Sequence, residues 1–216
     1  KARYVLGLSA TVTRKDGHHP IIFMNCGPIR YRVDAKRQAE ARPFEHKVVV
    51  RTTEMRLPPE LQFQERPSIQ AIYAALAADK ERNHLIVSDV LAAVDAGRSP
   101  VVLTERTDHL EWLVEALSRH IPNVITLRGG MGRKQRAAIT EKIASIPDSE
   151  SRVLASTGRY LGEGFDDARL DTLFLALPVS WKGTIIQYSG RLHRLHDRKK
   201  EVVIYDYADL CIPMLT

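Results

Sequence analysis

The chain has 216 residues, 44% of them apolar and 27% charged, which is an ordinary composition for a soluble globular protein with one sizeable core. No apolar run approaches membrane-spanning length, so we expect no bilayer insertion and no membrane partner. The net charge of +6 favours an anionic partner, most commonly nucleic acid, although a mildly basic surface would explain it equally well.

The first 45 residues do not share the pattern of the rest of the chain. "YVLGLSAT", from residue 4, is typical of a strand whose own sheet is missing, "IIFMNCGPIRYRV" of an extended run, and "DAKRQAEARP" of a charged connector. We interpret residues 1–45 as the end of a preceding domain plus a linker, and residues 46–216 as a separate domain. Because the chain has no initiator Met and opens inside an expected strand, we expect it to be part of a longer protein.

The next segment predicts a short strand at 48–50 and two helices. The first helix follows Pro67 and places Ile69, Ile72, Tyr73 and Leu76 on one face. The second is expected to begin at Asn83 as its cap and to end at Gly97, with its apolar residues at Ile86, Val90 and Val94.

From residue 100 onwards strands and amphipathic helices alternate. Strands are predicted at 100–104, 123–127, 152–156, 171–177 and 201–207, with helices at 107–120, 133–146 and 184–195. Such alternation predicts an α/β fold in which a parallel sheet is covered by helices on both faces. Sheets of this kind bind ligands beyond the carboxyl ends of their strands, so the loops at that edge are the candidate sites.

One of these loops is "LASTGRYLGEGFDD", residues 154–167, with glycines at 158, 162 and 164. A Rossmann fingerprint requires G-x-G-x-x-G opening a helix, whereas this order is G-x-x-x-G-x-G and leads to another strand. No G-x-x-x-x-G-K-[ST] phosphate loop occurs in the chain. Taken alone, the segment is compatible with an ordinary strand–helix turn, and a methyltransferase-type glycine loop stays open.

A second polar motif is "QYSGRLHR", residues 187–194. Gln187, Arg191 and Arg194 are four and three residues apart, so they share one face of the predicted helix. Each guanidinium can bind two oxygens of a phosphate, and the face therefore suits a polyphosphate. The alternative is that these arginines are surface charges paired with the acids of the following "DRKKE".

Taken in order, "LSATVTRKDG" from Leu8, the glycine loop and "QYSGRLHR" resemble motifs III, V and VI of superfamily 2 helicases. Within that superfamily the resemblance is to the DEAD/DEAH-type branch that is similar to restriction endonuclease subunit R. Residues 101–106 resemble motif IV, and residues 127–136 the loop and helix that follow the next strand. The likeness covers nearly the whole chain. It departs from the pattern at Val12, where many relatives carry a proline.

The resemblance implies a RecA-like (P-loop NTPase-type) fold and the C-terminal domain of an ATP-dependent helicase or translocase. Such enzymes bind ATP between two RecA-like domains. The upstream domain of the same protein would carry the Walker A lysine and the acids that hold Mg²⁺. We therefore expect ATP and Mg²⁺ as cofactors, with the Mg²⁺ ligands outside this chain, and no ATP hydrolysis by this chain alone.

The resemblance also assigns roles to individual residues. Arg191 and Arg194 would be catalytic fingers on the γ-phosphate, and which of them dominates stays open. ATP would be bound by Gly164, Asp166 and Gln187. Nucleic acid would contact Thr157 and Gly158, together with Thr104, Arg106, Arg128 and Gly129 at neighbouring strand ends. The alternative for the two arginines is that they are solvated surface charges. The nucleotide state would be coupled to nucleic-acid grip by Ser9, Ala10 and Thr11.

DNA is the first expected partner and RNA the alternative, and by analogy a nuclease module is a further one. A different class of function stays open as well, namely a non-catalytic nucleic-acid-binding or scaffold module with a RecA-like fold. No set of His, Cys and acidic residues has metal-ligand spacing, so no metal site within the chain is expected. The two cysteines are too far apart in sequence for a disulfide framework, which suits a reducing cytoplasm.

Overall fold

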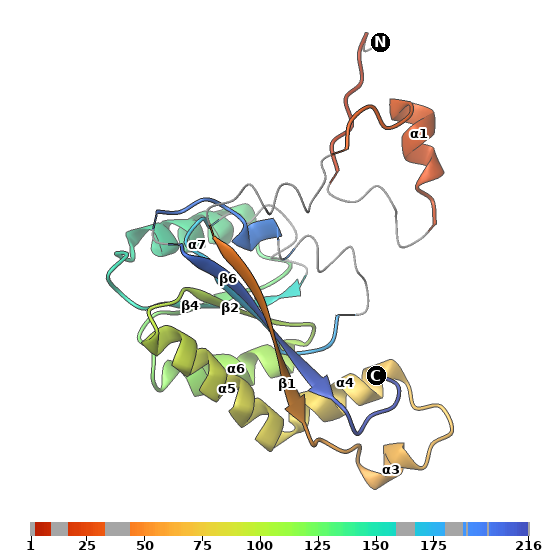
Figure 1. The fold of residues 1–216 in the computed structure, drawn as a ribbon, viewed down its shortest axis with the longest axis vertical. Helices are drawn as coiled ribbons and strands as arrows, with labels where there is room; N and C mark the ends of the chain where they lie inside the picture. Colours follow the sequence, from red (N-terminus) through yellow and green to blue (C-terminus); the bar gives the residue numbers. More distant parts are fainter. Residues whose placement is uncertain are drawn as a thin grey trace.

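Figure 1 shows the computed structural model of the chain, which describes residues 3–9, 17–32, 44–158, 167–179, 188, 190–197 and 199–215. Its centre is a six-stranded sheet in the order β1-β6-β5-β2-β4-β3, and all neighbouring strands are parallel. The strands are β1 (Glu45–Thr53), β2 (Pro100–Thr104), β3 (Val124–Leu127), β4 (Val153–Thr157), β5 (Thr172–Leu175) and β6 (Glu201–Asp209). The predicted parallel α/β fold is confirmed.

Most of the helices lie between successive strands of the chain. Those described are α1 (Pro20–Cys26), α3 (Pro59–Gln62), α4 (Ile69–Ala78), α5 (Lys80–Asp95), α6 (Thr107–Ser118) and α7 (Arg133–Ser145). Residues 188 and 190–192, from the last predicted helix, are helical too.

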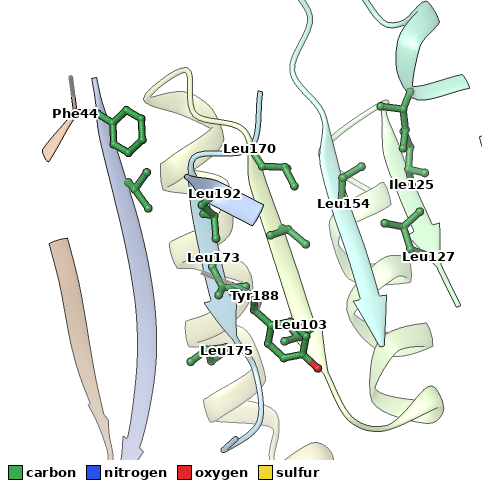
Figure 2. Close-up of a cluster of buried hydrophobic side chains, with 13 residues drawn as sticks. Phe44, Leu103, Ile125, Leu127, Leu154, Leu170, Leu173, Leu175, Tyr188 and Leu192 are labelled. Atoms are coloured by element: carbon green, nitrogen blue, oxygen red, sulfur yellow. The ribbon is translucent and has the colours of Figure 1, made fainter. Parts of the chain in front are cut away.

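The sheet buries apolar side chains on both faces because successive residues of a strand point to opposite sides. On one face, α5 and α6 cover Val102, Val153 and Phe174. On the other face, Ile143 of α7 packs with Tyr188, Leu192 and the strand residues between them. Figure 2 shows this second cluster, with Leu103, Leu154 and Leu173 contributed by three neighbouring strands. Strands buried on both faces explain the continuous apolar runs in the sequence.

Helix boundaries agree with local chemistry, with one correction. Ser68 caps α4 by accepting a hydrogen bond from Ala71 N at 3.2 Å. The cap of α5 is Asp79, whose carboxylate accepts from Arg82 N at 2.7 Å, and the prediction of Asn83 as the cap is wrong. Asn83 is instead buried inside the helix, where its side chain bonds to Ala77 O at 2.8 Å. Gly97, with φ of 75°, ends α5 as predicted.

The N-terminal residues differ from the expected pattern. Residues 3–9 form no strand, and Tyr4 and Leu8 are 82% and 86% exposed. A strand needs a paired neighbouring strand, and none of the described strands of the sheet pairs with this segment. Residues 21–26, expected to be extended, belong to α1 instead, with Pro20 at its first turn and Gly27 after its last. In Figure 1 this segment stands apart from the sheet.

Candidate functional site

The carboxyl edge of the sheet brings three predicted loops together. Thr104 at the end of β2 is paired with Thr157 at the end of β4, and Leu127 at the end of β3 is paired with Ser156. The loops that begin at residues 105, 128 and 158 therefore start side by side. The six residues predicted to contact nucleic acid all lie in or beside these loops.

Thr104 organises the start of its loop from a buried position. Its side-chain oxygen lies 3.0 Å from His109 Nδ1 and accepts from Arg106 N at 3.3 Å. His109 Nε2 lies 2.9 Å from Asn83 Oδ1, an acceptor, so Nε2 carries the proton and Nδ1 accepts from the Thr104 hydroxyl. Burial, with the Arg82 charge second, lowers the pKa of His109 from its ordinary 6.5 to about 4. Thr104 thus acts on the loop through its neighbours, since only 1% of it is exposed.

Both predicted basic residues of this edge are partnered by acids. The Arg106 guanidinium forms a two-point pair with the Asp108 carboxylate, at 3.0 and 2.6 Å, and this pair lowers the pKa of Asp108. Arg128 Nη1 lies 3.1 Å from Glu111 Oε1, with both side chains about half exposed. Exposed ion pairs are weak and exchange readily with other charged groups. Both guanidiniums therefore remain accessible to a phosphate that competes with the carboxylate.

The loops after β3 and β4 are joined at their first residues. The Gly129 N–H donates to Thr157 Oγ1 at 3.3 Å. Gly130, one residue later, has a φ of 82°, a backbone conformation that favours glycine. The exposed backbone at 128–130 is therefore held next to the end of β4.

Gly158 is where the edge meets the last predicted helix. A Cβ on this residue would stand 2.3 Å from the Tyr188 hydroxyl oxygen and 2.6 Å from Glu105 Oε1. Figure 2 shows Tyr188 beside Leu103 with its hydroxyl toward the arrowheads of the strands, and Leu192 farther from them. Burial, and secondly the Glu105 carboxylate, raise the pKa of Tyr188. Tyr188 thus connects the "QYSGRLHR" segment to the edge that holds the six predicted residues.

The two arginines of that segment flank a buried anchor. Leu192 is fully buried in the core, whereas Arg191 is half-buried and Arg194 is exposed. The backbone carbonyls of Leu192 and Arg194 each accept a hydrogen bond from the buried Lys199 ammonium, at 2.7 Å. The segment is thereby anchored at a buried position, while Arg191 and Arg194 are more exposed than Leu192.

One described residue of the predicted set is not brought to this edge. Ser9 belongs to the exposed N-terminal segment that stands apart from the sheet in Figure 1. Five others lie outside the described residues, namely Ala10, Thr11, Gly164, Asp166 and Gln187.

Sequence reasoning missed Glu105, His109, Tyr188 and Lys199. Only Tyr188 carried a signal, because an aromatic residue inside a polar motif on a predicted helix is a candidate for packing on the sheet. Glu105 and His109 meet residues far away in sequence, Gly158 and Asn83, and nothing in the charged run around Lys199 marks that lysine as buried.

In the described part of the chain, no three His, Cys, Asp or Glu side chains converge on a common metal position. The described helices also include none with the length and apolar character needed to cross a bilayer.

Comparison with known proteins gives no matching family model. Two curated viral relatives align with nearly the whole chain. The protein named "Putative helicase 161L" of invertebrate iridescent virus 6 is 26% identical over 96% of the chain, and "Probable helicase D10" of Escherichia phage T5 is 25% identical over 95%. The chain is similar to the C-terminal domain of superfamily 2 helicases. It spans less than half the length of these two relatives, 46% and 43%.

The fold comparison agrees with this similarity. The crystal structure of T4 UvsW superposes on 77% of the chain with a TM-score of 0.58 and 16% sequence identity, and the match covers 33% of UvsW. At that level of identity the match concerns the fold alone. The predicted RecA-like fold of this helicase-type domain is confirmed.

Proposed function

We propose that the chain is the second RecA-like domain of an ATP-dependent helicase or translocase. In this proposal the carboxyl edge of the sheet grips nucleic acid, and Arg191 and Arg194 complete an ATP site formed with a preceding domain. The observation that carries the proposal is the meeting of Gly158, Glu105 and Tyr188, because it joins the glycine loop and the arginine motif at one edge. The helicase names of the two viral relatives support the same reading.

The proposed division of the chain follows the sequence. Residues 1–45 would be the end of the first domain and the linker, and residues 46–216 the second domain. Two observations support this division. The described helix α1 has no buried residue, and Phe44, immediately before β1, is the first buried residue among those that the structure describes.

The proposed nucleic-acid grip is a backbone-type contact. Arg106 and Arg128 would meet phosphates, while Thr157 and the peptide groups of Gly129 and Gly158 would supply neutral donors. Thr104 would act by shaping the loop that carries Arg106. Such a surface binds the sugar–phosphate backbone without reading the bases. DNA remains the first expected partner and RNA the alternative. An associated nuclease module and a cytoplasmic location also remain predictions.

The proposed chemistry places the arginines on the γ-phosphate. ATP with Mg²⁺ would be held by the preceding domain and by Gly164, Asp166 and Gln187, and Ser9–Thr11 would couple the nucleotide state to the grip. A guanidinium donates two parallel hydrogen bonds to phosphate oxygens, which stabilises the charge that develops during hydrolysis. Because this chain contains no Walker A sequence, the hydrolysis would need the other domain.

The experiment that tests the proposal is Arg194→Lys in the protein that contains this chain. An ammonium keeps the charge but cannot reproduce the two-point contact. We expect kcat for nucleic-acid-stimulated ATP hydrolysis to fall roughly 100-fold or more, with ATP affinity little changed. Turnover within about threefold of wild type would remove Arg194 as the finger, and the same result for Arg191→Lys would remove the proposed role of the motif. A protein that binds nucleic acid but shows no hydrolysis before mutation would fit the non-catalytic alternative.

A further inference from the structure

Lys199 is a buried lysine whose ammonium donates hydrogen bonds to two backbone carbonyls. Only 7% of the residue is exposed. Its Nζ donates to Leu192 O and to Arg194 O, both at 2.7 Å, and lies 5.7 Å from the centre of the Phe44 ring. An ammonium is costly to bury unless its protons find partners, so a lysine at this position indicates a specific contact.

The two accepting carbonyls lie where the helical residues 190–192 end. The last carbonyls of a helix lack partners inside the helix, and they carry the negative end of its dipole. A cation placed there satisfies both needs at once. Lys199 therefore fixes the backbone at Leu192, which follows Arg191, and at Arg194 itself.

Aromatic rings also pack against the same segment. The His193 ring lies 4.8 Å from the His46 ring and 6.1 Å from the Phe44 ring, centre to centre. His46 lies in β1 and Phe44 immediately precedes this strand, so the arginine segment contacts the start of the first strand as well as Lys199. Phe44 contacts both the lysine and His193, which makes the three one unit.

We propose that Lys199 is a positioning residue for the proposed phosphate-binding arginines. By donating to the carbonyls of Leu192 and Arg194, it fixes the backbone that carries both arginines. Both guanidiniums can then contact one phosphate that is bound to a second domain. This inference rests on the proposed function. Lys199 itself makes no contact with ATP, because its ammonium lies beneath the segment and donates to backbone carbonyls.

The first test measures the anchoring without using ATP. Backbone amide hydrogen exchange is compared for wild type, Lys199→Met and the matched control Lys200→Met, which removes the neighbouring exposed lysine. We expect Lys199→Met to speed exchange of the amides of residues 190–197 at least tenfold, with those of β4 and β5 unchanged. Unchanged exchange at 190–197 would overturn the proposal. Should Lys199→Met fail to fold, Lys199→Gln is used, since its amide keeps donors but is too short to reach both carbonyls.

The second test asks whether Lys199 affects ATP hydrolysis through Arg191 and Arg194. In the full-length protein, Lys199→Met should lower kcat for ATP hydrolysis at least tenfold with KM within twofold, while Lys200→Met behaves as wild type. In an Arg191→Ala/Arg194→Ala background, Lys199→Met should cost less than a further twofold, since both residues that it positions are gone. Equal losses in both backgrounds would overturn the proposal. If Arg194→Ala and Arg191→Ala alone turn over as wild type, the proposed function fails instead, and the exchange result still decides whether Lys199 anchors the segment.

Discussion

The hydroxyl oxygen of Tyr188 lies so close to Gly158 that a Cβ at position 158 would stand 2.3 Å from it. The same Cβ would stand 2.6 Å from Glu105 Oε1. Contacts this short force something to move, and Tyr188 is buried in the core beside Leu103 and Leu175. The absence of a side chain at position 158 is therefore what allows the loops after β2 and β4 to meet the segment that carries Tyr188.

Gly158→Ala should accordingly destabilise the domain by about 1–3 kcal/mol, the usual cost of inserting a methyl group into a packed site. Urea unfolding followed by circular dichroism measures this change. Gly190→Ala is the matched control, because a Cβ there meets no atom within 4 Å and the backbone is helical, so its stability should be unchanged or higher by up to about 1 kcal/mol. Equal unfolding midpoints for Gly158→Ala and wild type would show that the edge can open at little cost. Adding Tyr188→Phe should restore part of the loss, since one of the two close oxygens is removed.

The elements predicted correctly from sequence are those with a local cause. Strand β2 matches its predicted bounds because an uninterrupted apolar run flanked by polar residues is sufficient to mark a strand buried on both faces. Asn83 was misassigned because its partners, Ala77 O and the ring of His109, come together only in the folded chain. Lys199 is hidden in the charged run "DRKKE", where nothing local separates the buried lysine from the exposed Lys200. The alternation of strands and helices was enough to predict which loops lie at the carboxyl edge of the sheet, but not which residues of these loops contact one another.

The buried His109 should make stability depend on pH. Its folded-state pKa of about 4 lies below the ordinary 6.5, so the unfolded chain takes up this proton first as the pH falls. The His109 contribution is therefore fully present above pH 6.5 and is lost between pH 6.5 and 4. A shift of this size corresponds to about 3 kcal/mol.

The measurement is the free energy of unfolding of wild type and His109→Gln across that pH range. We expect wild type to lose about 3 kcal/mol of unfolding free energy relative to His109→Gln from pH 7 to pH 4. The reason is that the variant has no histidine at this position to take up a proton on unfolding. His120→Gln, at an exposed histidine, should follow wild type throughout. A constant difference between His109→Gln and wild type would show that His109 does not titrate with a lowered pKa.

The buried pair of Arg82 and Asp209 predicts a strongly non-additive pair of mutations. Arg82 Nε donates to Asp209 Oδ1 at 2.9 Å, and neither side chain is exposed to solvent. Thr53 donates to the same oxygen at 2.6 Å, and Arg82 Nη1 donates to Ala176 O at 2.6 Å. The pair thus connects α5 to three neighbouring strand ends. Arg82→Leu alone should cost about 3–5 kcal/mol, because it leaves Asp209 charged, buried and without its counter-ion.

Arg82→Leu combined with Asp209→Leu should be far less destabilising than the sum of the two single changes. Replacing both charges removes the buried ionic group together with its desolvation cost. Among the described residues, Arg82 Nη2 and Asp209 Oδ2 have no protein partner, which adds to that cost. Urea unfolding of wild type, both single variants and the double variant measures the coupling. Additive losses would show that the two residues stabilise the fold through separate contacts.

The ion pair between Arg128 and Glu111 predicts opposite effects of two mutations on nucleic-acid binding. Glu111 Oε1 lies 3.1 Å from Arg128 Nη1 at the proposed grip, so a phosphate must displace this carboxylate to reach the guanidinium. Arg128→Gln removes one positive charge and should weaken binding of single-stranded nucleic acid several-fold. It should also make the salt dependence shallower by about 0.7 in the slope of log affinity against log salt. Glu111→Gln removes the competitor and should strengthen binding by roughly twofold or more.

Fluorescence anisotropy titrations at two salt concentrations measure both effects. Glu115→Gln is the control, because Glu115 lies one helical turn farther along α6 and pairs with Arg119 rather than with an arginine of the edge. Its removal adds the same change in net charge, so any gain from general electrostatics appears there too. A gain with Glu111→Gln that exceeds the gain with Glu115→Gln, and that disappears when Arg128→Gln is added, would place a phosphate at Arg128. Equal gains from the two glutamates would mean that Arg128 contributes only to the overall charge of the surface. The bound nucleic acid would then not contact the end of β3.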